Sequence, residues 1–139
     1  FMKWLKKLFI PGIKSSESDI APTTPDPEDR RGLYLLSDYG RSCQLVSPAI
    51  SPNAIEDLVN SIEWEAGFYH VICTRQPGIS MEVSGSLNGA DGLSAMYRNR
   101  PEKVECVITQ PPENRAEMIE ILISFALSKD PWHEKYTFE

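Results

Sequence analysis

Four short runs of alternating apolar and polar residues follow one another between residues 68 and 109. Turn-forming residues separate the runs, among them Gly78, Asn88-Gly89 and Asp91-Gly92, and glycine accepts the positive φ angles that tight hairpins demand. A helix-periodic stretch lies on either side of this region. The arrangement predicts an α+β fold, an antiparallel β-meander of about five to six strands packed against two helices.

Another hairpin is predicted before the meander. Residues 33–37 are apolar, and Asp38-Tyr39-Gly40 is typical turn chemistry before a second run at residues 42–46. Ser51-Pro52 then begins a helix, with serine as the cap and proline in the first turn. The apolar residues of this helix recur at helical spacing: Ile55, Leu58, Val59 and Ile62.

Residues 68–74 are apolar on both faces, which predicts an interior strand. Alternation over residues 79–84 predicts one buried face and one solvent-exposed face that carries Glu82. Pro111-Pro112 begins a second helix that runs to about residue 128 and has only a narrow polar stripe. We expect this helix to be covered on more than one side, either by the first helix and the sheet or in part by a partner. Residues 132–139 are expected to add a further edge strand.

The chain divides into three segments. Residues 1–13 form a short basic amphipathic segment, in which Trp4, Leu5, Leu8 and Phe9 share one helical face opposite Lys3, Lys6 and Lys7. Residues 14–32 are rich in Ser, Pro and acidic residues and predict a flexible linker. Residues 33–139 form a single α+β domain. A helix as short as residues 2–10 is unstable alone, so it should dock on a membrane, on its own domain or on another subunit, or else remain disordered.

Charge excludes some partners and favours others. The net charge of -6 argues against a nucleic-acid binder, which needs a basic face. Residues 42–74 hold four acidic residues and no Lys or Arg, so a basic partner is plausible there. No stretch is long and apolar enough to span a bilayer and no secretory signal is recognisable, which makes a cytoplasmic location the expectation. Cys43, Cys73 and Cys106 fall in predicted strands and are expected to be buried, reduced thiols.

No catalytic or cofactor signature emerges. His70 and Cys73 are three residues apart in a strand, so their side chains should project to opposite faces. The glycines around residues 85–92 precede another strand rather than a helix, which argues against a phosphate site. With two histidines and scattered cysteines, no metal site is predicted, and no cofactor. We therefore expect a protein that is not an enzyme.

The acidic residues near the first helix are open to two interpretations. They can form an ordinary solvated face, or, with aromatic residues as anchors, a binding face for a basic protein. The candidate partner-binding residues are Glu56, Asp57, Glu63, Trp64, Glu65, Tyr69, Glu82 and Asp91.

Residues 55–127 carry a resemblance, above all in the strings MEVSGSLNGADGLSAMY and CVITQPPENRAEMIEILISFAL. A small acidic α+β domain of this build resembles the immunity proteins of bacterial polymorphic-toxin and interbacterial-competition systems. The resemblance implies a non-enzymatic inhibitor that binds a cognate toxin with a basic groove and neutralises it by a protein–protein interaction. The basic leader departs from that picture and leaves room for weak membrane contact or self-association.

Two other functions stay open. An acidic secretion chaperone or adaptor, usually a homodimer, would hold an effector segment on the apolar second helix. A small enzyme could also assemble its site from residues that no motif reveals. The sequence is compatible with either a monomer or a homodimer.

Overall fold

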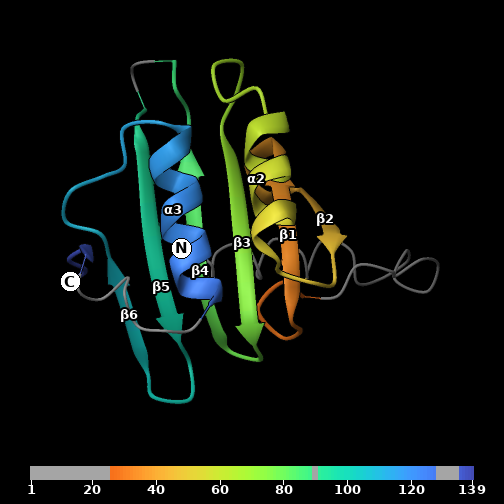
Figure 1. Ribbon diagram of the computed structural model, residues 1–139, viewed down its shortest axis with the longest axis vertical. Helices are drawn as coiled ribbons and strands as arrows, with labels where there is room; N and C mark the ends of the chain where they lie inside the picture. The colour runs from red at the N-terminus through yellow and green to blue at the C-terminus, as the bar shows by residue number, and fades with distance from the viewer. Residues whose placement is uncertain (1–25, 89–90, 128–134) are drawn as a thin grey trace.

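A six-stranded antiparallel sheet carries two helices on one face (Figure 1), which confirms the predicted α+β class. The computed structural model describes residues 26–88, 91–127 and 135–139. The predicted segment 1–13 and residues 14–25 of the predicted linker lie outside these ranges. The strands are β1 (Gly32–Ser37), β2 (Ser42–Ser47), β3 (Tyr69–Gln76), β4 (Ile79–Gly85), β5 (Leu93–Asn99) and β6 (Val104–Val107).

The strand order is β2-β1-β3-β4-β5-β6. The predicted hairpin is present as β1 and β2, joined by the short 3-10 turn η2 (Asp38–Gly40). However, β1 also pairs antiparallel with β3, because α2 carries the chain back across the sheet between β2 and β3. Only β3 to β6 form the simple meander that the alternating runs predicted.

Helix α2 (Pro52–Ser61) begins where the sequence predicted. The side chain of Ser51 accepts a hydrogen bond from the backbone N–H of Ala54 at 3.2 Å, and Pro52 occupies the first turn. Ile55, Leu58 and Val59 face the sheet and are buried. The opposite side of the helix is therefore free to carry charge.

Helix α3 (Arg115–Ala126) begins after Asn114, whose side chain accepts from the backbone N–H of Glu117 at 2.9 Å. It lies beside α2 and packs over β4 and β3 (Figure 1). Ile119 and Ile123, on the flanks of the helix, are partly buried against the same core. Helix α3 is thus enclosed by α2 and the sheet, the first of the two arrangements expected. Its fully buried residues are Met118, Ile121, Leu122 and Phe125.

The ordered domain begins earlier than predicted. Pro27 and Glu28 are buried, and the carbonyl of Glu28 accepts a hydrogen bond from the backbone N–H of Gly78 at 2.7 Å. Tyr34 Oη also donates to the carbonyl of Arg30 at 2.8 Å. The assignment of residues 26–32 to a flexible linker was therefore wrong, because tertiary contacts hold a stretch whose composition is polar.

Of the predicted edge strand at residues 132–139, residues 132–134 lie outside the described ranges, and residues 135–139 form a single bridge, between Ile108 and Phe138. Val107 and Glu139 exchange two backbone hydrogen bonds, at 3.1 and 2.8 Å, beside that bridge. Residues 135–139 thereby extend the sheet next to β6 (Figure 1). No helix within the described ranges has the length and apolar character required to cross a membrane.

Candidate functional site

The outward side of α2 is acidic. Glu56 and Asp57 are exposed on it, and Glu63 is exposed just after the helix. Their exposure follows from the helical period, since the buried residues of α2 fill the opposite side. These three exposed carboxylates belong to a stretch, residues 42–74, that holds no Lys or Arg, and Arg115 of α3 is a cation that interacts with Glu63 as well as with Glu65.

Glu65 belongs to the same region but is already paired. Arg115, at the start of α3, donates from Nη1 and Nη2 to the two carboxylate oxygens of Glu65 at 3.1 and 2.8 Å. The same guanidinium also donates to the carbonyl of Ile62 at 3.2 Å. The hydrogen bond from Arg115 lowers the pKa of Glu65 below its ordinary value. Glu65 therefore fastens the loop after α2 to α3 and adds little negative potential of its own.

Trp64 cannot be an exposed anchor. Its side chain is 0% exposed, and its indole Nε1 donates to the carbonyl of Val59 at 3.0 Å. Tyr69 is partly buried and meets Trp64 edge to face, with ring centroids 6.0 Å apart. The predicted placement of Trp64 on the binding face was wrong, because the loop after α2 folds this large apolar ring into the core.

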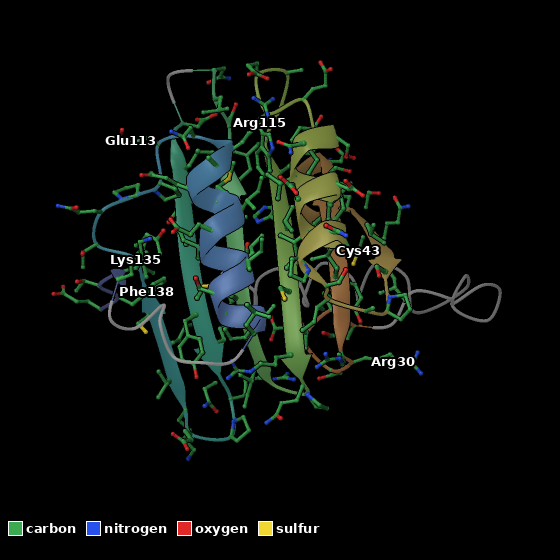
Figure 2. The ribbon with its side chains drawn as sticks, viewed as in Figure 1. Arg30, Cys43, Glu113, Arg115, Lys135 and Phe138 are labelled. Atoms are coloured by element: carbon green, nitrogen blue, oxygen red, sulfur yellow. The ribbon has the colours of Figure 1, made fainter. Side chains whose placement is uncertain are left out.

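Asp91 lies in the turn between β4 and β5 and is exposed. This turn is held against the loop after α2, because the carbonyl of Trp64 accepts from Leu87 N and Ser86 Oγ, both at 2.9 Å. Glu113, before α3, is exposed at the same end of the sheet as Arg115 (Figure 2). The sequence reading missed Glu113, although an acid beside a helix start is a recognisable signal. We use "acidic surface" for these residues together: Glu56, Asp57, Glu63, Glu65, Asp91 and Glu113.

Glu82 is not part of that surface. It lies on the second face of the sheet, which we define as the face directed away from α2 and α3, and it is 2% exposed. His70 Nδ1 lies 2.5 Å from one oxygen of Glu82, and Arg98 Nη1 donates to the other at 3.1 Å. The prediction that Glu82 lies on a solvent-exposed side of its strand was wrong, because that side of β4 is covered.

The ion pairs continue towards the turn that precedes β1. Arg98 Nε donates to Glu105 at 2.9 Å, and Arg98 Nη1 lies 3.9 Å from Glu28. Arg100 pairs with both Glu28 and Asp29. We call this set the buried charge network; its buried members are Glu28, His70, Glu82 and Arg98, and its exposed ends are Asp29, Arg100 and Glu105.

Sequence reasoning missed the buried charge network. The available signal was the pairing of strands: Glu82 lies diagonally opposite His70 on β3 and Arg98 on β5 once the hairpin registers are known. A histidine paired with a carboxylate is also an arrangement used for proton transfer. Here both side chains are 2% exposed, so the pair is closed to substrate and holds β3 and β4 together.

The predicted divergence of His70 and Cys73 is confirmed, since His70 faces the second face and Cys73 the helix-covered core. Burial raises the pKa of the Cys73 thiol to about 12, which leaves it protonated and unreactive. All three cysteines are free. Among the described residues no cluster of three or more His, Cys, Asp or Glu side chains could hold a metal ion.

A hollow of about 630 Å³ lies between residues 108–113, the first turn of α3 and residues 135–137. Its charged lining includes Glu113, Glu117 and Lys135. Lys135 Nζ and Tyr136 Oη both donate to Glu120 of α3. The hollow shares Glu113 with the acidic surface, and the described residues that line it include no histidine or cysteine that could act as a nucleophile.

Comparison of the chain with protein-family models, curated proteins and solved structures found no match.

Proposed function

We propose that this chain acts by binding a basic protein through the acidic surface, as an immunity protein that neutralises a cognate bacterial toxin. The observation that carries the proposal is the outward side of α2 with the loop that follows it. There Glu56, Asp57 and Glu63 are exposed together, without a cation among residues 42–74. The arrangement supports a binding role more than a catalytic one, since it presents fixed charges and no nucleophile.

The acidic surface can attract a basic partner by electrostatic steering. Like charges gathered on one side of a small domain create a potential that speeds diffusional encounter with a basic partner. Two contacts also hold part of the acidic surface rigid before any partner binds. The Arg115–Glu65 pair and the hydrogen bonds to the carbonyl of Trp64 fix the loop and the adjacent turn, so little ordering entropy is lost on binding.

A toxin that acts on nucleic acid has a basic substrate groove, and an acidic domain can occupy it in place of the substrate. The resemblance of residues 55–127 to immunity proteins points in the same direction. Blocking the groove requires no chemistry from the inhibitor itself.

The alternative function, a secretion chaperone or adaptor, needs an apolar docking surface on α3. The apolar residues of this helix instead pack against α2 and the sheet, and the large residue exposed at its end is Leu127. The packing therefore favours the acidic surface over α3 as the place of contact.

The test measures association with the partner recovered by co-purification with the full chain from its host. In the variant Glu56→Lys/Glu63→Lys, the association rate constant should fall about tenfold or more, and its dependence on salt should weaken. The matched control is Glu102→Lys/Glu139→Lys. It changes the net charge by the same amount at two exposed positions, one in the turn between β5 and β6 and one beside β6, whereas α2 packs against α3.

An equal loss of rate in both double variants would mean that net charge, and not the acidic surface, governs binding. A recovered partner that is not toxic to cells lacking this chain would refute the immunity role. Turnover of a small substrate by the purified chain, abolished by one side-chain change, would refute the non-enzymatic proposal altogether.

A further inference from the structure

The central part of the second face of the sheet is buried, although α2 and α3 do not cover it. Tyr34, Leu36 and Ile72 are each 0% exposed there and form a separate apolar cluster, against which Cys43 and Leu45 pack. His70 and Glu82 are buried beside them. Yet α2 and α3 both lie on the opposite face (Figure 1). Burial of this kind requires a covering layer.

The described residues supply only part of that layer. The turn at residues 26–31 covers one end of the face, where Thr74 donates to the carbonyl of Pro27 and Tyr34 to that of Arg30. Leu36 and His70 pair with each other at the far end of β1 and β3. At that end the Phe68 ring packs beside His70, with ring centroids 5.4 Å apart, so residues 26–31 cover one end of the face and Phe68 contributes at the other.

Chain connectivity limits which segment of the chain can reach and cover the second face of the sheet. Residues 89–90 are two residues at the tip of a hairpin, and residues 128–134 run between the end of α3 and the bridge beside β6. Residues 1–25, in contrast, precede Asp26 directly, and Pro27 and Glu28 already lie on the second face. A linker over residues 14–25 can span roughly 40 Å when extended, which exceeds the length of any of these strands.

We propose that residues 2–10 dock on the second face of the sheet, with Trp4, Leu5, Leu8 and Phe9 packed over Tyr34, Leu36 and Ile72. The segment has the apolar stripe of an amphipathic helix and cannot be stable alone at this length, so it gains its structure from the sheet. The sheet in turn gains the second apolar layer that the cluster requires.

The charges of the second face and of residues 2–14 also favour docking of this segment. The buried charge network, His70 aside, holds four carboxylates and two guanidinium groups, and with Asp26, Arg30 and Arg31 of the covering turn this face keeps an excess of one negative charge. Residues 2–14 carry four lysines and no acid. Lysines at the rim of the docked segment compensate the excess negative charge while their long side chains reach solvent.

The reactivity of the Cys43 thiol can report whether the second face is covered. Cys43 lies on β2 opposite Leu36 and packs against the apolar cluster of the second face. Burial raises the pKa of its thiol to about 12, so the thiol should react slowly while the face is covered. Replacement of Cys106 by serine removes the other accessible thiol, because Cys73 is fully buried.

The experiment measures the rate of Cys43 modification by a thiol reagent in the full chain carrying Cys106→Ser. The variant Leu5→Glu/Leu8→Glu should raise that rate about tenfold or more, because the partly buried thiol becomes open to the reagent and loses the burial that raises its pKa. The control Ser15→Glu/Ser16→Glu adds the same charge to the linker and leaves the apolar stripe intact, so its rate should stay unchanged.

A second measurement does not depend on a disruptive variant. In Trp132→Phe the remaining indoles are Trp4 and the buried Trp64. If residues 2–10 are docked, acrylamide should quench the fluorescence of both indoles only weakly. Strong quenching of about half of the fluorescence would mean that Trp4 is exposed and would overturn the proposal. Equal rates of Cys43 modification in all variants would also overturn it. If the protection of Cys43 disappears on dilution and sedimentation shows a dimer, the second face is covered by a second copy of the chain, and the proposal is overturned.

Discussion

His70 Nδ1 lies 2.5 Å from Glu82 Oε2 across two neighbouring strands, and both side chains are 2% exposed. The second oxygen of Glu82 holds Arg98 on the next strand at 3.1 Å. A single carboxylate therefore connects β3, β4 and β5 on the face of the sheet that carries no described helix.

Loss of Glu82 should destabilise the domain. Glu82→Met leaves the Arg98 guanidinium without the buried carboxylate that pairs with its Nη1 at 3.1 Å, and we expect a loss of about 3 kcal/mol in the free energy of unfolding. This is the lower end of the usual range because Glu105 still accepts from Arg98 Nε. Urea denaturation measures the change.

The double variant Glu82→Met/Arg98→Met is the matched control for that prediction. It removes both charges, so it should cost less than the two single changes added together, by about 1–3 kcal/mol of coupling. Additive single effects would show that the two residues stabilise the fold independently.

Gly85 and Gly92 should respond very differently to alanine. A Cβ at Gly85, whose φ is +128°, would lie 2.1 Å from the carbonyl oxygen of Gly92, and backbone cannot yield there. Gly92 has a φ of +72° and no atom within 4 Å of such a Cβ. Gly92→Ala should therefore cost only about 1 kcal/mol, the price of a left-handed conformation, and Gly85→Ala considerably more. Equal midpoints in thermal denaturation would contradict this difference.

Trp64 should matter for stability and not for recognition. Trp64→Phe removes the hydrogen bond to Val59 and leaves a small void, so we expect a loss of about 1–2 kcal/mol in the free energy of unfolding. The association rate with the partner should remain that of the unaltered chain. A slower association with unchanged stability would restore Trp64 as a contact residue.

The attachment of the C-terminal residues should depend on pH. Hydrogen bonds from Lys135 and Tyr136 lower the pKa of Glu120 below its ordinary 4.5 in the folded state. Their stabilisation is therefore fully present above pH 4.5 and is lost as the pH falls through the lowered pKa. Hydrogen exchange of the Glu139 amide, which donates to Val107, should accelerate relative to the rest of the sheet in that acid range.

Glu120→Gln is the control for this pH response. Glutamine keeps the shape and an acceptor oxygen but does not titrate, so the extra acceleration should disappear in this variant. Acceleration that persists in the glutamine variant would assign the effect to another acid, such as Glu117 in the same turn of α3.

The sequence by itself determined the local elements. Serine and proline at residues 51–52 set the start of α2, the apolar run at residues 69–74 marked an interior strand, and Gly78 and Gly92 marked turns. These features depend on neighbours in the chain, through capping, alternation and permitted φ angles, so they can be read from the order of residues. The exposed carboxylates of α2 follow from the same helical period.

Only the tertiary structure decided which polar residues are buried. Glu82 and Ser80 look solvent-exposed in an alternating strand, and Trp64 looks like a surface aromatic among acids, yet all three are covered. Their burial depends on strand order and on what packs against the second face, which bring together residues far apart in the sequence. Alternation of apolar and polar residues along a strand indicates that its two faces differ. Which face is exposed to water is decided only by the segments that pack against each face.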